Sequence, residues 1–247
     1  MKITFLLLLS FTLSAATLHI DYIGKFSLFG KVAKASIIYT NNGKKYSIKV
    51  VGHGTGTVGY LTQHKKYIYQ SIGLVKNNNL IPLKYIAQEI KEDYNKTKIY
   101  LFDYDHNRTL ITKYLKKKAG MSYNIFSASE HKSNFIHKKS TKILKRVYNN
   151  DMVSVLFNRN NHLLNLKVGK SKLIYAVGSK DTQKGIIVKL ISIVDGKYKY
   201  SVTLKKDYLQ GGSAKVTFIL DSNNILDEAR LNGILFFGNA TIKRLML

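Results

Sequence analysis

The stretch ASIIYTNNGKKYSIKV, residues 35–50, decides the predicted fold of the chain. After the Asn42-Gly43 dipeptide, Tyr46, Ile48 and Val50 alternate with polar residues, so they lie on one face of a strand. Asn-Gly accepts the positive φ angles of a type I′ turn, and the apolar residues before the turn supply a second strand. The stretch therefore predicts an antiparallel hairpin with one buried face.

The same alternation recurs in the C-terminal third of the chain. The apolar positions that share a face are Tyr198, Tyr200, Val202 and Leu204 in one segment and Ala214, Val216, Phe218 and Leu220 in another. Asp195-Gly196 predicts a tight turn just before the first of these segments. The run from Ile186 to Val194 is apolar on both faces, which predicts a central strand covered on both sides.

Further turn signals divide the rest of the chain into segments of strand length. They are Asn77-Asn78-Asn79, Asp105-His106-Asn107 and Ser222-Asn223-Asn224. About ten strands result, without a repeat of fixed period, and the single proline and 17 tyrosines agree with a β-rich chain. We expect a mainly β protein with an antiparallel, strongly curved sheet, a half-barrel or barrel-like form, and one or two short helices.

The middle of the chain breaks this pattern. Residues 112–150 hold ten basic side chains against one acid, Glu130, and they predict a basic irregular insert. Residues 142–148 have the spacing of a short amphipathic helix, and a solvated loop is the alternative. Asp151 can cap a helix over residues 152–157 that would cover the sheet.

The N-terminus has the pattern of a secretory signal peptide. Lys2 is followed by the apolar run Phe5 to Leu13 and by the small residues Ser14, Ala15 and Ala16. The run is too short for the roughly 20 apolar residues of a transmembrane helix. We expect residues 1–16 to be removed and residues 17–247 to form one β-rich domain in the periplasm.

Composition limits the partners of such a domain. The chain has no cysteine, so it can carry neither a disulfide nor a lipidated N-terminal cysteine. The formal net charge of +26 falls to +25 once Lys2 is removed. In the periplasm such a charge favours phospholipid head groups, lipopolysaccharide, an envelope protein or acidic polymers over nucleic acid, and it permits peripheral contact with a membrane. The alternative is a lysine-rich codon bias that has loaded solvent-facing positions.

The residues predict no catalytic, metal or cofactor site. The seven histidines lack the spacing of a zinc helix, and Arg108 stands where a calcium loop starting at Asp103 needs glycine. Residues 52–59, GHGTGTVG, lack the GK[ST] ending and the following helix of a phosphate loop, so they predict a bend, a bulge or a close backbone approach. A hydrolase with scattered catalytic residues is the enzymatic alternative.

The order of these features resembles the domain-of-unknown-function 3108 family of exported bacterial proteins over nearly the whole mature chain. The residues that carry the resemblance are Tyr22, Phe29 to Ala33, Tyr46, Gly54-Thr55-Gly56, Leu80 to Leu83, Asp103-Tyr104-Asp105, Asp151 to Phe157, Val202-Thr203-Leu204, Asp221 and Gly238 to Thr241. The resemblance implies an antiparallel curved sheet in the envelope, similar in outline to half-barrel carriers of lipids or lipoproteins. It implies no catalytic residue, and the lysine load and the basic middle depart from the family pattern.

Two functions follow as hypotheses. In the first, the curved sheet binds an acyl chain or a lipidated partner on a concave face lined by Tyr198, Tyr200, Phe218 and Phe236. In the second, an envelope assembly or interaction protein binds an anionic polymer or a protein through its basic surface. The residues expected to bind anions are Lys116, Lys117, Lys118, Lys138, Lys139, Lys142 and Arg146. Both hypotheses describe a non-enzymatic protein without a cofactor.

Overall fold

A computed structural model describes residues 16–119, 135–158, 163, 165–178, 185–205, 213–234 and 238–246. Fourteen strands in these residues form one antiparallel sheet, accompanied by two short helices. The strands are β1 (Ala16–Phe26), β2 (Gly30–Asn41), β3 (Lys45–Gly54), β4 (Lys66–Lys76), β5 (Asn79–Lys91), β6 (Tyr94–Asp103), β7 (Arg108–Lys118), β8 (Phe135–Leu144), β9 (Ser171–Ile174), β10 (Ile186–Val194), β11 (Lys197–Lys205), β12 (Ser213–Leu220), β13 (Leu226–Ile234) and β14 (Gly238–Arg244). The helices are α1 (Gly56–Leu61) and α2 (Ser154–Phe157).

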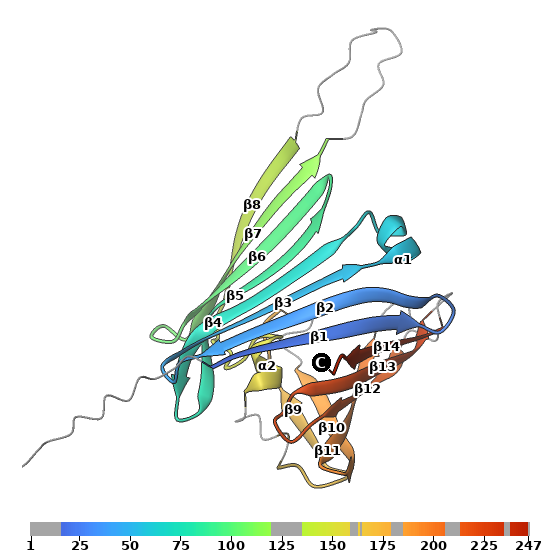
Figure 1. Ribbon diagram of the computed structural model, residues 1–247. Helices are drawn as coiled ribbons and strands as arrows, with labels where there is room; N and C mark the ends of the chain where they lie inside the picture. Colours follow the sequence, from blue (N-terminus) through green and yellow to red (C-terminus); the bar gives the residue numbers. More distant parts are fainter. Residues whose placement is uncertain are drawn as a thin grey trace, which may run out of the picture.

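The strands follow one another as in a meander, and the first strand, β1, also pairs with the last, β14. Each strand pairs with its neighbour in the chain from β1 to β8 and from β9 to β14, and β1 also pairs with β14. The two free edges of the sheet are therefore β8 and β9, which follow one another in sequence. The sheet curls without closing, and β6 to β8 extend away from α2 (Figure 1). This confirms the expected antiparallel, strongly curved sheet.

The register between strands defines an inner face of the curl. Residues directly opposite one another on paired strands have side chains on the same face. On this criterion the buried residues Tyr22, Ile48, Tyr85, Tyr100 and Tyr200 lie on one face of the whole sheet. We call this face the inner face.

Register shifts accompany the curl. They occur between Gly24 and Lys25, between Ile72 and Gly73, and at corresponding irregularities in β10, β12 and β13. Such bulges bend a strand and increase its twist. At Gly73 the bend leaves no room for a side chain, because a Cβ atom would lie 2.0 Å from the carbonyl oxygen of Ile81. Glycine is therefore required at this position.

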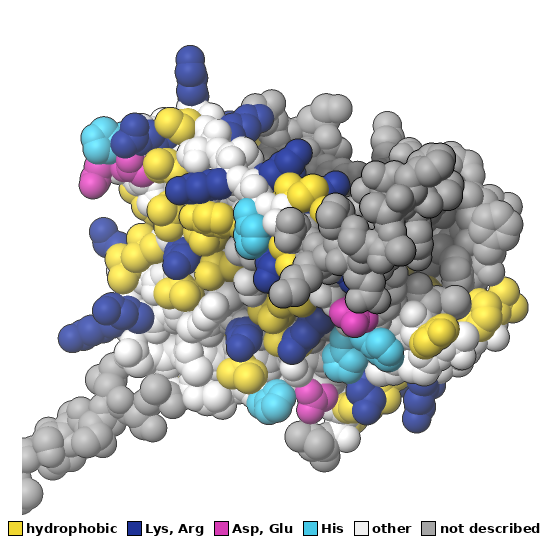
Figure 2. All heavy atoms as spheres, turned by 90° about the horizontal axis from the view of Figure 1, so that it is seen from above, with side chains coloured by type: hydrophobic (Ala, Val, Ile, Leu, Met, Phe, Trp, Pro, Cys, Tyr) yellow, Lys and Arg dark blue, Asp and Glu magenta, His cyan; other side chains and the backbone are white. Residues whose placement is uncertain are grey.

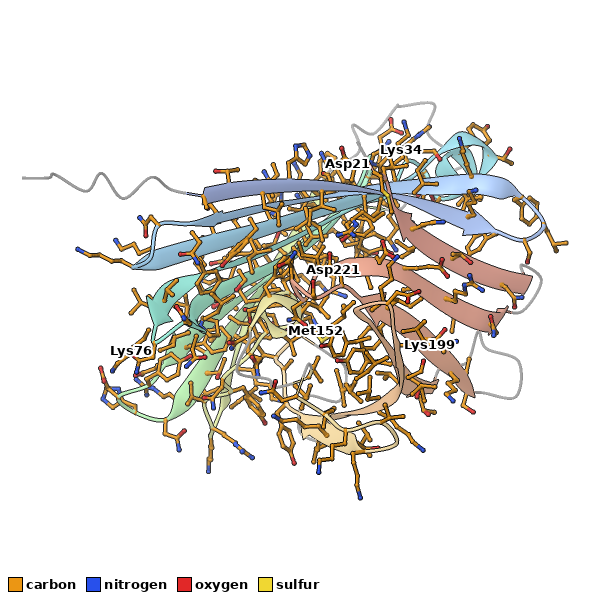
Figure 3. All side chains as sticks on the ribbon, turned by 60° about the horizontal axis from the view of Figure 1, so that its bottom comes forward. Asp21, Lys34, Lys76, Met152, Lys199 and Asp221 are labelled. Atoms are coloured by element: carbon orange, nitrogen blue, oxygen red, sulfur yellow. The ribbon has the colours of Figure 1, made fainter. Side chains whose placement is uncertain are left out.

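The inner face is filled at one end by the segment that joins β8 to β9. We call the described residues before β9 (145–158, 163 and 165–170) and those just after it (175–178), with α2 among them, the plug. Two clusters of buried side chains pack around it, one with Tyr148, Val153 and Val177 against β1 to β6, and one with Val155 against β9 to β12. In Figure 3 Met152 of the plug lies inside the curve of the sheet, and this residue packs against both clusters.

A buried carboxylate fastens the plug to the sheet. Asp151 is fully buried and accepts hydrogen bonds from the amides of Val153 and Ser154, both at 2.8 Å. It also accepts one from the Ser71 hydroxyl of β4 at 2.5 Å. Since Ser71 donates to Asp151, the Tyr46 hydroxyl at 2.9 Å donates to Ser71. The Ser154 hydroxyl in turn accepts from the Asp151 amide. The helix begins at Ser154, two residues later than expected, and Val153 occupies its N-cap position, so Asp151 fixes the turn that precedes the helix.

A buried amide fastens the end of the same helix. The Asn158 side chain donates to the Leu80 carbonyl at 3.0 Å and accepts from the Leu80 amide at 3.3 Å. It therefore pairs with the backbone of β5 as a neighbouring strand would. It also donates to the Asn150 side chain at 3.1 Å, which links the two ends of the α2 turn. Both ends of α2 are thus fixed to the inner face.

The basic middle of the chain is more regular than expected. Within residues 112–150, β7 continues to Lys118 and β8 runs from Phe135 to Leu144, which raises the strand number above the expected ten. The prediction of a short helix over residues 142–148 is wrong, because residues 142–144 belong to β8 and residues 145–148 form no helix. Lysines at consecutive positions hid the alternation, since an edge strand exposed on both faces needs no apolar side.

Two further expectations are corrected. β10 is not covered on both sides, because Ile187 on its outer face is 62% exposed and Val194 is 61% exposed, while only its inner residues are buried. A short helix, α1, begins at Gly56 within residues 52–59, so the expected absence of a helix at these glycines is wrong. The expected close backbone approach there is present, because a Cβ atom on Gly59 would lie 2.9 Å from the Gly54 carbonyl oxygen.

The positions of the predicted turns are confirmed, but the type I′ geometry expected at Asn42-Gly43 is not, because only Gly43 of this pair has a positive φ. The Asn42-Gly43 turn joins β2 to β3, and the Asp195-Gly196 turn joins β10 to β11 with φ angles of 50° and 69°. The three other turn signals fall between β4 and β5, β6 and β7, and β12 and β13. Residues 1–15, most of the expected signal peptide, lie outside the described residues. Neither described helix is long and apolar enough to cross a membrane.

We expect Asp151→Ala to lower the free energy of unfolding by about 3 kcal/mol or more, because three buried donors would lose their acceptor. Urea denaturation of the chain from residue 17 measures the change. Asp105→Ala, in the exposed β6–β7 turn, is the control and should alter stability by about 0.5 kcal/mol or less. Equal effects of the two substitutions would contradict a fastening role for Asp151.

Candidate functional site

The strands β6, β7 and β8 form a basic arm of the sheet. They carry nine lysines, at positions 96, 98, 113, 116, 117, 118, 138, 139 and 142, and one acid, Asp103. Asp103 is already engaged by Arg108 at 2.7 Å and by His106, which hold the pKa of its carboxyl at about 2. Every residue of β8 except Leu144 is exposed. The arm is therefore a strongly cationic surface.

The register divides the lysines between the two faces of the arm. Six lie on the inner face: Lys96, Lys98, Lys113, Lys117, Lys138 and Lys142. Three lie on the outer face: Lys116, Lys118 and Lys139. Among the described residues, none of the six inner lysines forms an ion pair. The nearest acid of the inner face is Glu89 of β5, which pairs with Lys65 at 2.6 Å.

Lys98 is the most constrained of these cations. It lies opposite Ala87 of β5 and Lys113 of β7, and it is partly buried. Burial lowers the pKa of Lys98, and the neighbouring charges of Lys96 and Lys113 lower it further. The inner face thus holds positive charges close together, and the one carboxylate opposite them, that of Glu89 across from Lys96, is already paired with Lys65.

The opposite arm of the sheet is apolar on its inner face. Beyond the plug, the inner positions of β11 to β14 are Val202, Ala214, Val216, Phe218, Ala229, Leu231, Ala240 and Ile242. None of them carries a charge, and all are at least partly exposed, Ile242 at 43%. We call these eight residues the apolar wall.

Small residues separate the basic arm from the apolar wall. Where β1 to β3 run past the plug, their inner positions are Gly24, Ala33, Ala35, Gly52 and Gly54. A Cβ atom on Gly52 would meet nothing closer than 3.9 Å, so there is room above this position, whereas a Cβ atom on Gly54 would lie 3.2 Å from Gly59 of α1. On the basic side, β4 adds the stacked rings of Tyr67 and Tyr69, 6.3 Å apart. The inner face away from the plug therefore has a cationic side, an apolar side and a floor of small residues.

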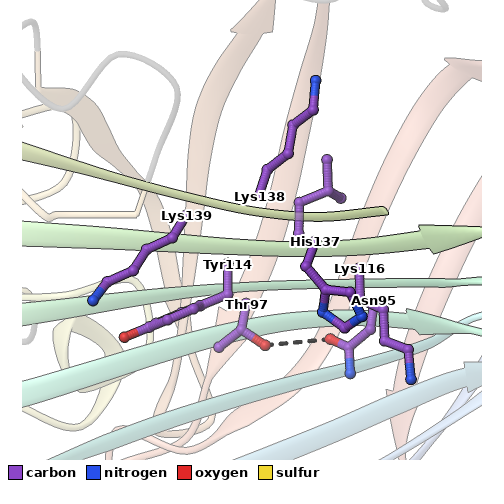
Figure 4. A pocket seen from close by; sticks show the side chains of 8 residues that line it. Asn95, Thr97, Tyr114, Lys116, His137, Lys138 and Lys139 are labelled. Carbon is purple, nitrogen blue, oxygen red and sulfur yellow. Dashed lines mark hydrogen bonds between the residues drawn. The ribbon is translucent and has the colours of Figure 1, made fainter. Parts of the chain in front are cut away.

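The outer face of the basic arm carries a shallow pocket of about 280 Å³. Its lining includes Asn95 and Thr97 of β6, Tyr114 and Lys116 of β7, and His137 and Lys139 of β8 (Figure 4). The Lys139 ammonium lies 5.8 Å from the Tyr114 ring centre. None of the described residues that line the pocket is acidic. In the view of Figure 2, Lys and Arg side chains lie beside hydrophobic ones, and acidic side chains are few.

The aromatic residues expected to face a ligand lie mostly in the core. Tyr200 is fully buried and stacks on Phe218 at 5.2 Å, and Tyr198 packs against the same cluster. Of the described members of this group, Phe218 also belongs to the apolar wall, whereas a ligand could reach Tyr200 only if the plug moved away. Phe236 lies outside the described residues.

The expected anion-binding residues do lie close together, with one exception. Lys116, Lys117, Lys118, Lys138, Lys139 and Lys142 are all on β7 or β8. Arg146 is apart from them, in the plug. The sequence analysis missed Lys96 and Lys98. Together with the buried residues Tyr100 and Phe102 they occupy every second position of β6, so all four side chains lie on the inner face. That alternation was a usable signal.

The described residues offer little for catalysis. No group of three or more His, Asp or Glu side chains among them could hold a metal ion. Burial raises the pKa of Asp151, and the hydrogen bonds from Ser71 and two amides oppose that shift. Its position inside the plug, however, keeps it from a dissolved substrate. We therefore assign it a structural role.

Fold and site together define a curled antiparallel β-sheet protein with an inner plug and a cationic arm. No family model matches the chain, so the resemblance to the domain-of-unknown-function 3108 family receives no support from that comparison. No curated protein matches it either. Among solved structures it is similar to a beta-barrel-like protein of domain of unknown function DUF1849 from Brucella abortus, with 11% identity and a TM-score of 0.40 over 94% of this chain and 96% of that one.

Proposed function

We propose that the chain is a non-enzymatic binding protein that holds an anionic lipid on the inner face away from the plug. The observation that carries the proposal is the separation of charge across that face. Lys96, Lys98 and Lys113 stand on the basic arm, and the apolar wall stands on the other side of a floor of small residues. A lipid with one charged end has the same division.

The energetics of the two sides favour such a ligand. Cations held close together in partial burial repel one another, and an anionic head group would relieve that repulsion and raise the lowered pKa of Lys98. Each methylene moved from water onto apolar surface contributes about 0.8 kcal/mol. Carboxylate or phosphate bound by Lys98 and Lys113 would thus fix one end, while the acyl chain covers residues such as Val216 and Leu231.

We further propose that the protein works in the periplasm after removal of residues 1–16. Lys2, the apolar run to Leu13 and the small residues up to Ala16 support this location. We expect the chain recovered from a periplasmic extract to begin at Thr17, which N-terminal sequencing or intact mass measures. Recovery of the full-length chain from the cytoplasmic fraction alone would overturn the proposal.

For the lipid site we expect the triple variant Lys96→Gln, Lys98→Gln, Lys113→Gln to bind palmitate and lysophosphatidylglycerol more than about tenfold more weakly than the unchanged chain, since each charge-assisted contact contributes about 1.5–3 kcal/mol. Calorimetry with delipidated protein, checked by native mass spectrometry, measures the affinity. Ala35→Phe, which places a ring on the floor, should weaken both lipids.

The matched control removes three lysines from the outer face of the same strands, in the variant Lys116→Gln, Lys118→Gln, Lys139→Gln. It has the same net charge as the inner variant, and we expect its lipid affinity to stay within about twofold of the unchanged chain. Equal losses in both variants would mean that general charge, and not the inner face, attracts the lipid. Failure of the unchanged chain to bind either lipid would overturn the proposal.

A second candidate function is the binding of an anionic polymer or an acidic protein by the outer face of the basic arm. The pocket of Figure 4 favours it, because Lys116, Lys139 and His137 surround the exposed ring of Tyr114 without an acidic neighbour in the lining. Exposed cations of this kind bind polyanions in a salt-dependent way.

The same two variants test the second candidate, but here the outer variant is expected to lose binding and the inner variant is the control. With heparin as the probe, we expect the outer variant to elute at lower salt than the inner variant, because the outer lysines line or flank the pocket. Elution of both variants together would contradict a polymer site on the outer face. Retention of heparin together with no lipid binding by the unchanged chain would make this the function of the arm.

A further inference from the structure

Exposed apolar side chains gather at the end of the sheet that lies away from the plug. The turn between β1 and β2 and the helix α1 are both at this end (Figure 1). In the turn, Leu28 is 69% exposed and Phe29 is 50% exposed, and in α1 Tyr60 is 77% exposed. Two segments of the chain therefore present large apolar side chains to water at the same end of the molecule.

Both segments are held in place by hydrogen bonds. The amide of Thr55, just before α1, donates to the Val32 carbonyl of β2 at 2.8 Å, and α1 packs against β2. The Ser27 amide donates to the Asn239 carbonyl of β14 at 3.0 Å, and the Asn239 amide donates to the Ser27 hydroxyl at 2.9 Å. The turn and the helix are thus fixed to neighbouring parts of the sheet, with α1 beside the start of β2.

The surroundings of these apolar side chains are basic. We call residues 25–31 and 55–66 the tip, and they hold four lysines, at positions 25, 31, 65 and 66, and no Asp or Glu. Lys25 and Lys31 lie opposite one another and are both exposed. Among the described residues, the only one of the four lysines in an ion pair is Lys65, with Glu89.

The turns at the plug end of the same strands have a different composition. They are Asn42-Gly43-Lys44, Asn77-Asn78 and Asp105-His106-Asn107, and all of these residues are polar or glycine. The β5–β6 turn lies at the same end as the tip, but it holds Glu92 and Asp93. The combination of exposed apolar side chains with lysines and without acids is therefore a property of the tip, and exposed apolar groups gathered in this way mark an interaction surface.

We propose that the tip docks on a bilayer that contains anionic phospholipid, with Leu28 and Tyr60 inserted below the head groups. Attachment of this kind grows with the apolar area that is buried and with the attraction of lysines to anionic lipid. A tyrosine suits the boundary because its ring is apolar and its hydroxyl stays in contact with water. A second copy of the chain fits the tip less well, because two tips carry the same sign of charge.

Docking deepens the proposed lipid binding and rests on that proposal for its purpose. The inner positions Gly24 of β1 and Gly54 of β3 directly precede the two segments of the tip in the chain. A lipid that leaves a bilayer beside the tip would therefore meet the floor of small residues first. The tip is a separate surface, however, and none of the lysines proposed to hold the lipid belongs to it.

A tryptophan reporter tests insertion, because the chain contains no tryptophan of its own. We expect the emission of the variant Leu28→Trp to shift to shorter wavelength on vesicles of phosphatidylglycerol and phosphatidylethanolamine, and brominated acyl chains should quench it. Val194→Trp is the matched control, since Val194 is 61% exposed at the opposite end of the sheet. Its emission should not change. An unchanged spectrum of Leu28→Trp on these vesicles overturns the inference.

Cosedimentation with the same vesicles measures the affinity. We expect the double variant Leu28→Ser, Tyr60→Ser to bind about tenfold more weakly or worse than the unchanged chain, because it loses most of the apolar area that would be buried. The control Ile143→Ser, Val194→Ser removes exposed apolar side chains at the plug end and should stay within about twofold. Phosphatidylcholine vesicles should bind the unchanged chain about tenfold more weakly or worse, because they carry no net charge to attract the lysines.

The remaining outcomes separate this inference from its alternatives. Equal binding by the tip and control variants overturns it, and so does a change in oligomeric state on sedimentation of the tip variant alone, which would make the tip an interface between copies. The tip variant should still bind soluble lysophosphatidylglycerol, and the variant Lys96→Gln, Lys98→Gln, Lys113→Gln should still dock on vesicles. Loss of docking with soluble lipid binding intact therefore concerns the tip, and the reverse result concerns only the inner face.

Discussion

The plug depends on one buried carboxylate. Asp151 has no exposed surface, yet three donors converge on it, two of them amides of its own turn and one the Ser71 hydroxyl of β4. A buried charge is costly unless its hydrogen-bonding capacity is satisfied, so the turn around α2 and the position of β4 fix one another. Tyr46 extends the chain of hydrogen bonds to β3. The rest of the inner face is arranged around this point.

A curled sheet needs something inside it, and the plug fills only part of the space. At the plug end the inner residues, such as Ile48, Tyr85 and Leu190, are fully buried. Farther along the same strands the inner positions become small or charged, and their exposure rises. Along a single strand the inner residues change from large and apolar to small or basic, for example from Ile48 to Gly52 in β3 and from Phe102 to Lys96 in β6. One fold thereby carries both a core and a surface suited to binding.

Much of the fold could be predicted from local sequence because hairpins are local objects. Asn42-Gly43 and Asp195-Gly196 specify turns by backbone geometry alone, and Tyr46, Ile48 and Val50 identify the buried face. The site could not be predicted in the same way. The burial of Tyr200 depends on a plug more than twenty residues away in the chain, and the sharing of lysines between two faces depends on a register that a lysine-rich strand does not reveal. Exposed edge strands such as β8 carry little alternation for the same physical reason.

The pairing of β1 with β14 sets the order in which the chain can be completed. Tyr22 lies opposite Arg244, so the contact joins residues from nearly opposite ends of the sequence. Strands β1 to β8 and strands β9 to β14 can each form from neighbouring hairpins. The pairing of β1 with β14, which joins the two groups, cannot form until β14 has been made. Until then β1 is an uncovered edge, able to pair with any other strand that reaches it. For a newly made chain, the most vulnerable interval is the one before β14 is available to pair with β1.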